Sequence, residues 1–307
     1  MTWSNKKVLV TGASGFIGSH LTERLVTLGA SVRALVHYNS RNDWGHIDRL
    51  PQMIQQELEI IPGDIQDPYA MQKAVAGCEI VFHLAALIAI PYSYRAPVSY
   101  VETNVKGTLN VMQACLSEGV AKVVHTSTSE AYGTAIYTPI DENHPLQGQS
   151  PYSASKIGAD KIAESYWLSF DLPVATIRQF NTYGPRQSAR AVIPTIITQA
   201  LAKDEISLGA LTPVRDLNFV QDTINGFIRI AESEKSIGEV INIGFGQGIT
   251  IGDLANKIFK LMGKDVKIVT DESRFRPPKS EVFKLICDHR KAEKLVDWAP
   301  QFTLDQG

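Results

Sequence analysis

The chain has 307 residues, a formal net charge of −2 and 44% hydrophobic residues, so it can bury the core of a large globular protein. Charges of both signs are interspersed without a basic stripe, which gives no support to nucleic-acid binding. Cys78, Cys115 and Cys287 are far apart and lack CxxC spacing, so neither a disulfide framework nor a metal site is indicated.

The N-terminal residues lead directly into a strand-like run without a signal peptide, and no apolar run reaches membrane-spanning length. We therefore expect a cytoplasmic protein that has neither a membrane nor a nucleic acid as its partner.

Short β-branched runs alternate with longer helical stretches, which is typical of parallel βαβ units. The pattern predicts strands at 7–10, 31–36, 58–61, 80–84, 123–127 and 174–178, and helices at 15–28, ahead of residue 80, at 101–116 and at 153–169. We predict an α/β fold with a Rossmann-type doubly wound parallel sheet. Residues 1–180 would form a dinucleotide-binding domain, and residues 181–307 a smaller, irregular α/β substrate-binding region interleaved with it.

A glycine-rich turn follows the first strand and opens a helix. Gly12 permits a tight turn, Gly15 lets the backbone approach a pyrophosphate, and Gly18 allows close packing of the helix on the sheet. This context favours dinucleotide binding over a plain strand-to-helix turn. The predicted contacts of this turn are Gly12, Ser14, Gly15, Phe16, Ile17 and Gly18.

Further cofactor contacts are expected after the next strands. An NAD site usually offers a carboxylate at the end of the second strand, but this chain has His37, and nearby Arg41 could hold a 2′-phosphate. This favours NADP mildly, although both residues could simply lie in a solvated loop. The remaining predicted contacts are Asp64 and Ile65 at the adenine, and Leu84, Ala85 and Ala86 against the cofactor.

Tyr152 and Lys156 are four residues apart, so on one helix they share a face. A nearby cation favours the phenolate, and we expect the pair to exchange a proton with a sugar or alcohol hydroxyl. The segment Thr128, Ser129, Glu130 adds a carboxylate that a simple dehydrogenase does not need. That carboxylate could alternatively cap the following helix.

Several motifs in order resemble the extended short-chain dehydrogenase/reductases of the NAD-dependent epimerase/dehydratase family, which act on nucleotide sugars. These motifs are the glycine-rich turn, the run 83–86, the Tyr152 and Lys156 pair, and the run 178–186. Within the family, Thr128 to Glu130 resembles the sugar-nucleotide 4,6-dehydratases of the GDP-mannose type and of bacterial legionaminic-acid pathways. The runs 145–152 and 187–194 are most similar to the second of these.

The resemblance implies a 4,6-dehydratase acting on UDP- or GDP-N-acetylglucosamine. Thr128 would bind the 4-hydroxyl, and Tyr152 with Lys156 would take its proton while bound NAD(P) oxidises C4. Glu130 would then remove the C5 proton, water would leave from C6, and the hydride would return to C6. The cofactor would be tightly bound and recycled. Some relatives have an aspartate as general acid where this chain has Ser129, so the acid here would be Glu130 or water.

The resemblance also implies substrate contacts and an assembly. The expected substrate-binding residues are Asn181, Arg190, Arg215 and Arg276 for the diphosphate and Glu281 for a ribose hydroxyl, each of which could instead be an ordinary surface residue. The helices over 101–116 and 153–169 would pair with a second copy in a homodimer. A UDP-glucuronate decarboxylase, a 4-epimerase and a non-catalytic dinucleotide sensor remain as alternatives.

Overall fold

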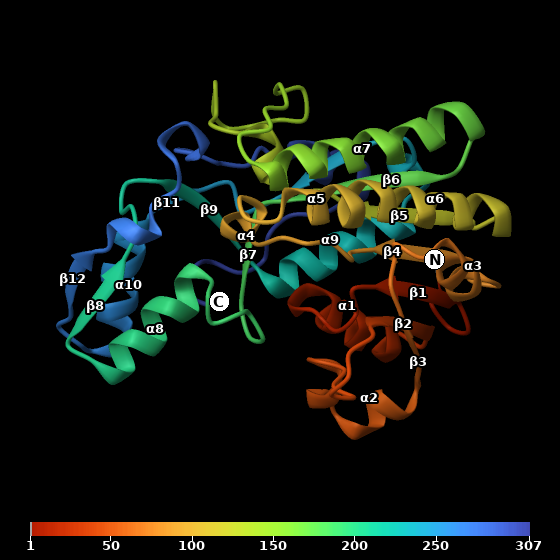
Figure 1. The fold of residues 1–307 in the computed structure, drawn as a ribbon, viewed down its shortest axis with the longest axis horizontal. Coiled ribbons are helices and arrows are strands. Elements are labelled where there is room, and N and C mark those ends of the chain that lie inside the picture. The colour runs from red at the N-terminus through yellow and green to blue at the C-terminus, as the bar shows by residue number, and fades with distance from the viewer. Residues whose placement is uncertain (1) are drawn as a thin grey trace.

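The computed structural model describes residues 2–307 and contains a seven-stranded parallel sheet with the order β3-β2-β1-β4-β5-β6-β10 (Figure 1). This is the strand order of a doubly wound dinucleotide-binding sheet with one additional strand, so the predicted fold is confirmed. The strands are β1 (Lys7–Thr11), β2 (Ser31–His37), β3 (Leu58–Gly63), β4 (Ile80–His83), β5 (Lys122–Thr126), β6 (Val174–Gln179) and β10 (Val240–Ile243).

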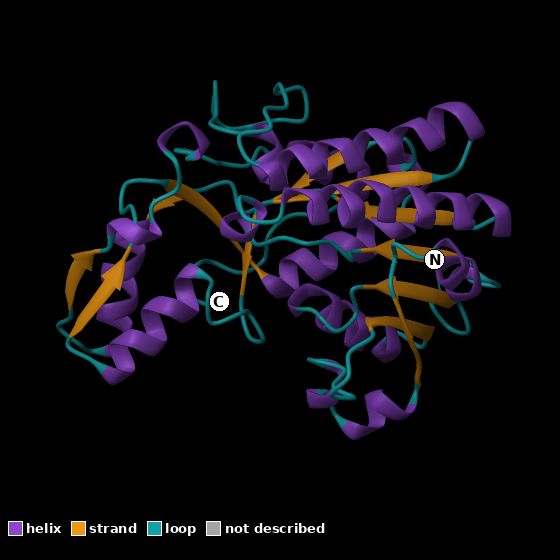
Figure 2. Cartoon of the chain, in the orientation of Figure 1, coloured by secondary structure: helices purple, strands orange, loops and turns teal. Residues whose placement is uncertain are grey.

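Helices cover both faces of this sheet (Figure 2). One face is covered by α1 (Phe16–Thr27), α2 (Gln52–Gln56), α9 (Val220–Glu232) and α11 (Arg290–Val296), and the other by α3 (Pro68–Val75), α6 (Gly107–Glu118) and α7 (Pro151–Phe170). Leu25 and Phe227 belong to the first core cluster, and Met71 and Val111 to the second. Across residues 2–307, every helix is too short or too polar to cross a membrane.

The start of α7 is fixed by local chemistry. The Ser150 hydroxyl accepts a hydrogen bond from the Ser153 backbone N–H, and the Ser153 hydroxyl accepts one from the Ser150 backbone N–H, which is a capping box. Pro151 occupies the first turn, where its missing N–H costs nothing. This start places Tyr152 in the first turn of the helix and Lys156 one turn later.

The helix predicted over 101–116 differs from expectation at its beginning. Short helices α4 (Ile90–Ser93) and α5 (Pro97–Tyr100) are followed by a π-helical segment over Val101–Lys106, and only then by α6. Buried Asn104 lies in this segment and hydrogen-bonds with the Leu87 backbone and the Ser155 hydroxyl. The π-helical segment therefore links the loop after β4 to α7 through the hydrogen bonds of Asn104.

A smaller lobe is built from the later part of the chain. Its elements are β7 (Asn181–Tyr183), β9 (Val214–Phe219) and β11 (Gly248–Thr250) in one sheet, β8 (Glu205–Leu208) paired with β12 (Lys267–Thr270), and the helices α8 (Val192–Ala202) and α10 (Ile251–Met262). Between these elements the chain returns to the large sheet, where α9 covers a face and β10 pairs with β6.

Candidate active site

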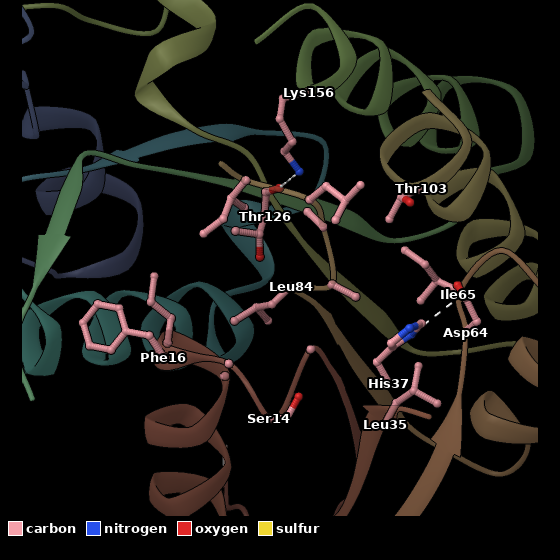
Figure 3. A pocket seen from close by; sticks show the side chains of 18 of the residues that line it. Ser14, Phe16, Leu35, His37, Asp64, Ile65, Leu84, Thr103, Thr126 and Lys156 are labelled. Atoms are coloured by element: carbon pink, nitrogen blue, oxygen red, sulfur yellow. Dashed lines mark hydrogen bonds and ion pairs between the residues drawn. The ribbon is translucent and has the colours of Figure 1, made fainter. Parts of the chain in front are cut away.

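A cleft of about 690 Å³ opens at the carboxyl ends of the parallel strands, around the point where the strand order reverses between β1 and β4 (Figure 3). This is the expected position for a ligand in an open α/β sheet, and the volume suits a cofactor-sized molecule. Nearly all predicted cofactor contacts line the cleft: Gly12, Ser14, Gly15, Phe16, Ile17, Gly18, His37, Asp64, Ile65, Leu84, Ala85, Ala86, Tyr152 and Lys156.

The glycine-rich turn has no room for side chains at two positions. A Cβ on Gly18 would lie 2.1 Å from the Gly12 carbonyl oxygen, and a Cβ on Gly12 would lie 2.9 Å from the Ala85 backbone nitrogen. Gly12 also has a φ of +71°, which favours glycine. No side chain at these two positions therefore separates the N-terminus of α1 from the cleft. This arrangement fits a dinucleotide pyrophosphate.

Buried polar atoms without partners lie beside this cleft. Thr126 Oγ1 and Gln179 Oε1 belong to lining residues, and neither has a hydrogen-bond partner among the residues that the structure describes. Because an unpaired buried polar atom is costly, these atoms fit a site that a polar ligand completes.

The predicted adenosine end contains His37 and Asp64, whose Nδ1 and Oδ2 atoms are 3.8 Å apart (Figure 3). Arg41 is not among the lining residues. Its side chain is exposed, and its backbone N–H donates to Asn39 Oδ1 at 3.0 Å within the same loop. The preference for NADP that was inferred from Arg41 therefore stays a prediction.

Tyr152 and Lys156 both line the cleft one turn apart on α7, and both are buried. Lys156 Nζ donates a hydrogen bond of 2.6 Å to the Thr126 carbonyl oxygen (Figure 3). The Thr128 hydroxyl lies close enough to the Tyr152 phenol to lower its pKa. A substrate hydroxyl that reaches Tyr152 would therefore also meet Thr128.

The pKa values of Tyr152 and Lys156 are both shifted, and that of Tyr152 moves against the predicted direction. Burial raises the pKa of Tyr152, the hydrogen bond from Thr128 lowers it, and the Glu130 charge raises it, with a net rise. This direction is opposite to the one predicted from the Tyr152 and Lys156 spacing, because burial is the largest influence on the phenol and Lys156 is not among the groups that shift its pKa. Burial lowers the pKa of Lys156 to about 8, against the opposing charge of Asp160.

A buried polar network behind Lys156 was missed by the sequence analysis. Asp160, one further turn along α7, accepts hydrogen bonds from Arg178 Nη2 at 2.8 Å, His125 Nε2 at 3.0 Å and Ser127 Oγ at 2.5 Å. Burial opposes ionisation of Asp160, but His125 and the charges of Arg178 and Lys156 lower its pKa overall. The sequence did contain a signal for Asp160. It lies four residues after Lys156, as Lys156 does after Tyr152, so all three share one face of the helix.

The predicted substrate residues form a row of alternating charges next to Tyr152. Arg276 Nη1 lies 3.4 Å from Glu130 Oε2 and 3.9 Å from Glu281 Oε1, and Arg215 Nη2 lies 3.3 Å from the same Glu281 oxygen. Glu130 does not cap the following helical turn, because Thr128 accepts from the Glu130 backbone N–H instead.

The other two predicted substrate residues lie outside this row. Asn181 is half-buried at the start of β7. Arg190 is exposed in the loop before α8, and the ion pairs of the row do not include it.

Comparison with known proteins places this site in a family. The family model for GDP-mannose 4,6 dehydratase matches residues 9–307. The chain belongs to the NAD-dependent epimerase/dehydratase family. The resemblance inferred from the motifs is therefore confirmed.

Relatives of this epimerase/dehydratase chain differ in their reactions. A UDP-glucose 4-epimerase of Mycolicibacterium smegmatis is 32% identical, with 98% of this chain and 96% of that protein covered. A UDP-N-acetyl-alpha-D-glucosaminuronate decarboxylase of Bacillus cytotoxicus is 32% identical, with 98% and 95% covered. The structure of a dTDP-glucose 4,6-dehydratase from Streptomyces venezuelae, solved with NAD, has a TM-score of 0.85 at 30% identity, with 98% and 94% covered. The reaction of this family member must therefore be argued from its site.

The lowered pKa of Lys156 predicts a pH-dependent contribution to stability. Between about pH 8 and the ordinary lysine pKa of about 10.4, the unfolded chain holds a proton that the folded chain has lost, so rising pH favours folding through this group. Relative to Lys156→Met, the wild type should gain up to about 1.4 kcal/mol per pH unit in this window. Urea titrations of both proteins at several pH values measure this, and parallel pH profiles would contradict it.

Proposed function

We propose that this family member is a nucleotide-sugar 4,6-dehydratase that acts on UDP- or GDP-N-acetylglucosamine. The observation that carries the proposal is the buried Glu130 carboxylate, which lies close enough to Tyr152 to affect the phenol's pKa. A 4-epimerase oxidises and reduces C4 and needs no second base, whereas elimination of water across C5 and C6 needs one.

The chain's own groups would divide the reaction between them. Thr128 holds the sugar 4-hydroxyl, Tyr152 accepts its proton, and the Lys156 ammonium stabilises the developing negative charge. Bound NAD(P) supplies reversible oxidation at C4 and is recycled, so it is held tightly. Glu130 removes the C5 proton acidified by the 4-keto group and can pass that proton to the hydroxyl leaving C6. Ser129, buried beside it, carries no acid for this step.

The proposed substrate contacts are Arg215, Arg276 and Asn181 at the diphosphate, because arginine pairs with two phosphate oxygens at once. Glu281 lies between the two arginines and would reach a ribose hydroxyl from there. Exposed Arg190 lies close enough to Tyr100 to influence its pKa, and Tyr100 packs against Tyr152, so Arg190 is proposed as a further diphosphate contact.

A decarboxylase is the second candidate function. Arg276 lies 3.4 Å from Glu130, where it could hold the carboxylate of a uronate substrate, and one of the relatives is a decarboxylase. Incubation with UDP-N-acetylglucosamine, GDP-N-acetylglucosamine and UDP-glucuronate, followed by mass spectrometry, separates the candidates. Loss of one water supports the dehydratase, loss of carbon dioxide supports the decarboxylase, and an epimer of unchanged mass contradicts both.

Glu130→Gln should abolish elimination while leaving the first oxidation intact, because the amide cannot remove the C5 proton. We expect turnover to fall by about 10²–10⁴-fold, the usual contribution of a general base. Substrate should still reduce the bound nicotinamide, which its absorbance would report. Glu272→Gln, an exposed carboxylate change, serves as control. Full dehydratase activity in the Glu130 variant would refute the assigned role.

We also propose a homodimer formed through the π-helical segment, α6 and α7. Val101 and Leu109 are exposed there, at 54% and 39%. Met112, within the same predicted helix over 101–116, is instead fully buried in the chain's own core. Changing Val101 and Leu109 together to glutamate should convert the dimer into a monomer, as measured by light scattering. Leu201→Glu, on exposed α8, should leave the dimer intact, and a monomeric wild type would contradict the proposal.

A further inference from the structure

Glu130, Arg276, Glu281 and Arg215 form a row of alternating charge on the substrate side of Tyr152. Successive members of the row are 3.4, 3.9 and 3.3 Å apart. The side chains of Glu130, Glu281 and Arg215 are at most 13% exposed, whereas that of Arg276 is 24% exposed. Each guanidinium is therefore already engaged by a carboxylate where the proposed function places a diphosphate.

The two ends of the Arg276 pair differ in how firmly they are held. Glu130 lies in a buried helical turn over Ser129–Tyr132, which Thr128 caps. Arg276 lies in a connection between two short helical turns, Glu272–Arg274 and Pro278–Ser280, and both of its neighbours, Phe275 and Pro277, are exposed. When the pair breaks, Arg276 is therefore the side chain that moves.

The pairing matters because it fixes the orientation of the Glu130 carboxylate. The Glu130 Oε2 atom accepts a hydrogen bond of 3.4 Å from Arg276 Nη1, so the guanidinium competes with a C5 proton for this oxygen. A diphosphate carries more negative charge than one carboxylate and matches the guanidinium fork, so it competes for Arg276.

We propose that Arg276 holds Glu130 in the absence of substrate, and that the diphosphate of a nucleotide sugar withdraws Arg276 and frees the base. The inference rests on the proposed function, in which Arg276 contacts the diphosphate. Arg276 is thus a positioning residue for Glu130. The base becomes available only when the nucleotide end of the substrate is in place, so a sugar without its diphosphate would be processed poorly.

The test is a thermodynamic cycle on nucleotide binding, with no turnover involved. The purified protein with its bound cofactor is titrated with UDP and with GDP by calorimetry, and the tighter-binding nucleotide is used. Glu130→Gln should raise its affinity about fivefold, the worth of a partly exposed ion pair, because the nucleotide no longer competes with a carboxylate. Arg276→Gln should lower the affinity, and the gain from Glu130→Gln should vanish in the double variant.

The dependence on Arg276 separates competition from simple charge repulsion. Repulsion between Glu130 and the diphosphate would give the same gain with and without Arg276, and that result would overturn the inference. The same holds if Glu130→Gln leaves affinity unchanged, or if the control Glu272→Gln raises it equally. Structural damage would lower the affinity, which is the opposite direction.

Two further arms distinguish this inference from the proposed function. If the coupling appears with UDP-glucuronate but not with UDP, Arg276 binds the sugar carboxylate and not the diphosphate. That result refutes the inference and supports the decarboxylase. If the nucleotide binds and water is lost from the sugar, but the cycle shows no coupling, only the inference fails. If neither nucleotide binds, both fail.

Discussion

Asp160→Asn should lower the free energy of unfolding by about 3–5 kcal/mol, the typical cost of removing one partner from a buried ion pair. The Arg178 guanidinium is 3% exposed and would lose its only carboxylate among the described ion pairs. His125 and Ser127 would lose their shared acceptor as well. Urea denaturation of the purified variant measures the loss directly.

Two comparisons make this prediction specific. Glu164→Gln, one turn further along α7, removes an exposed carboxylate paired with Lys161 and should change stability by less than about 1 kcal/mol. Replacing Asp160 by leucine and Arg178 by methionine together should recover part of the loss, since no buried charge is left unpaired. Equal stability of the Asp160 and Glu164 variants would refute the role of the network.

Gly18→Ala should disrupt the glycine-rich turn that lines the cleft. The added methyl group would meet backbone atoms of Gly12 and Ala13 at 2.1 to 3.0 Å, and backbone cannot rotate away as a side chain can. We expect a loss of about 3 kcal/mol in stability and at least about a tenfold loss in NAD(P) affinity, because the turn must shift to accommodate the methyl group. Denaturation curves and cofactor retention through gel filtration measure these two effects.

The matched control is Gly252→Ala in the first turn of α10. Its added methyl group would meet atoms no closer than 3.6 Å, which is an ordinary contact. That variant should be neutral or slightly more stable, because alanine restricts the unfolded chain. If Gly18→Ala retains its cofactor as well as Gly252→Ala does, the close packing at this turn does not contribute to cofactor binding.

The large sheet was predictable because its signals are local. Buried parallel strands appear in the sequence as short apolar runs, and strands β1 to β6 differ from the predicted ranges by one or two residues at their ends. The seventh strand of the sheet, β10, was not predicted and lies in the part of the chain assigned to the substrate-binding region. The position of the cleft followed for the same reason. Many of its lining residues lie at or directly after the ends of strands, and the carboxyl ends of parallel strands meet at one edge.

The substrate side depended on contacts that no local pattern contains. Glu130 and Arg276 are 146 positions apart, and their pairing comes from the way the smaller lobe folds back over β5. The short strands β8 and β12 also pair across a long stretch of chain, since Lys267 lies opposite Glu205. The raised pKa of Tyr152 was also out of reach, because it follows from burial, which spacing along one helix does not report.

The return of the chain to the large sheet bears on how such proteins could be recombined. A fragment ending near residue 180 would lack β10 and α9, so β6 would become an unprotected sheet edge and the core around Val124 and Ile177 would lose Phe227 and Ile243. Such a fragment should aggregate instead of folding. Substrate preference therefore cannot be exchanged between relatives as one C-terminal cassette. A graft would have to replace the segments on either side of 220–243 and keep that stretch native.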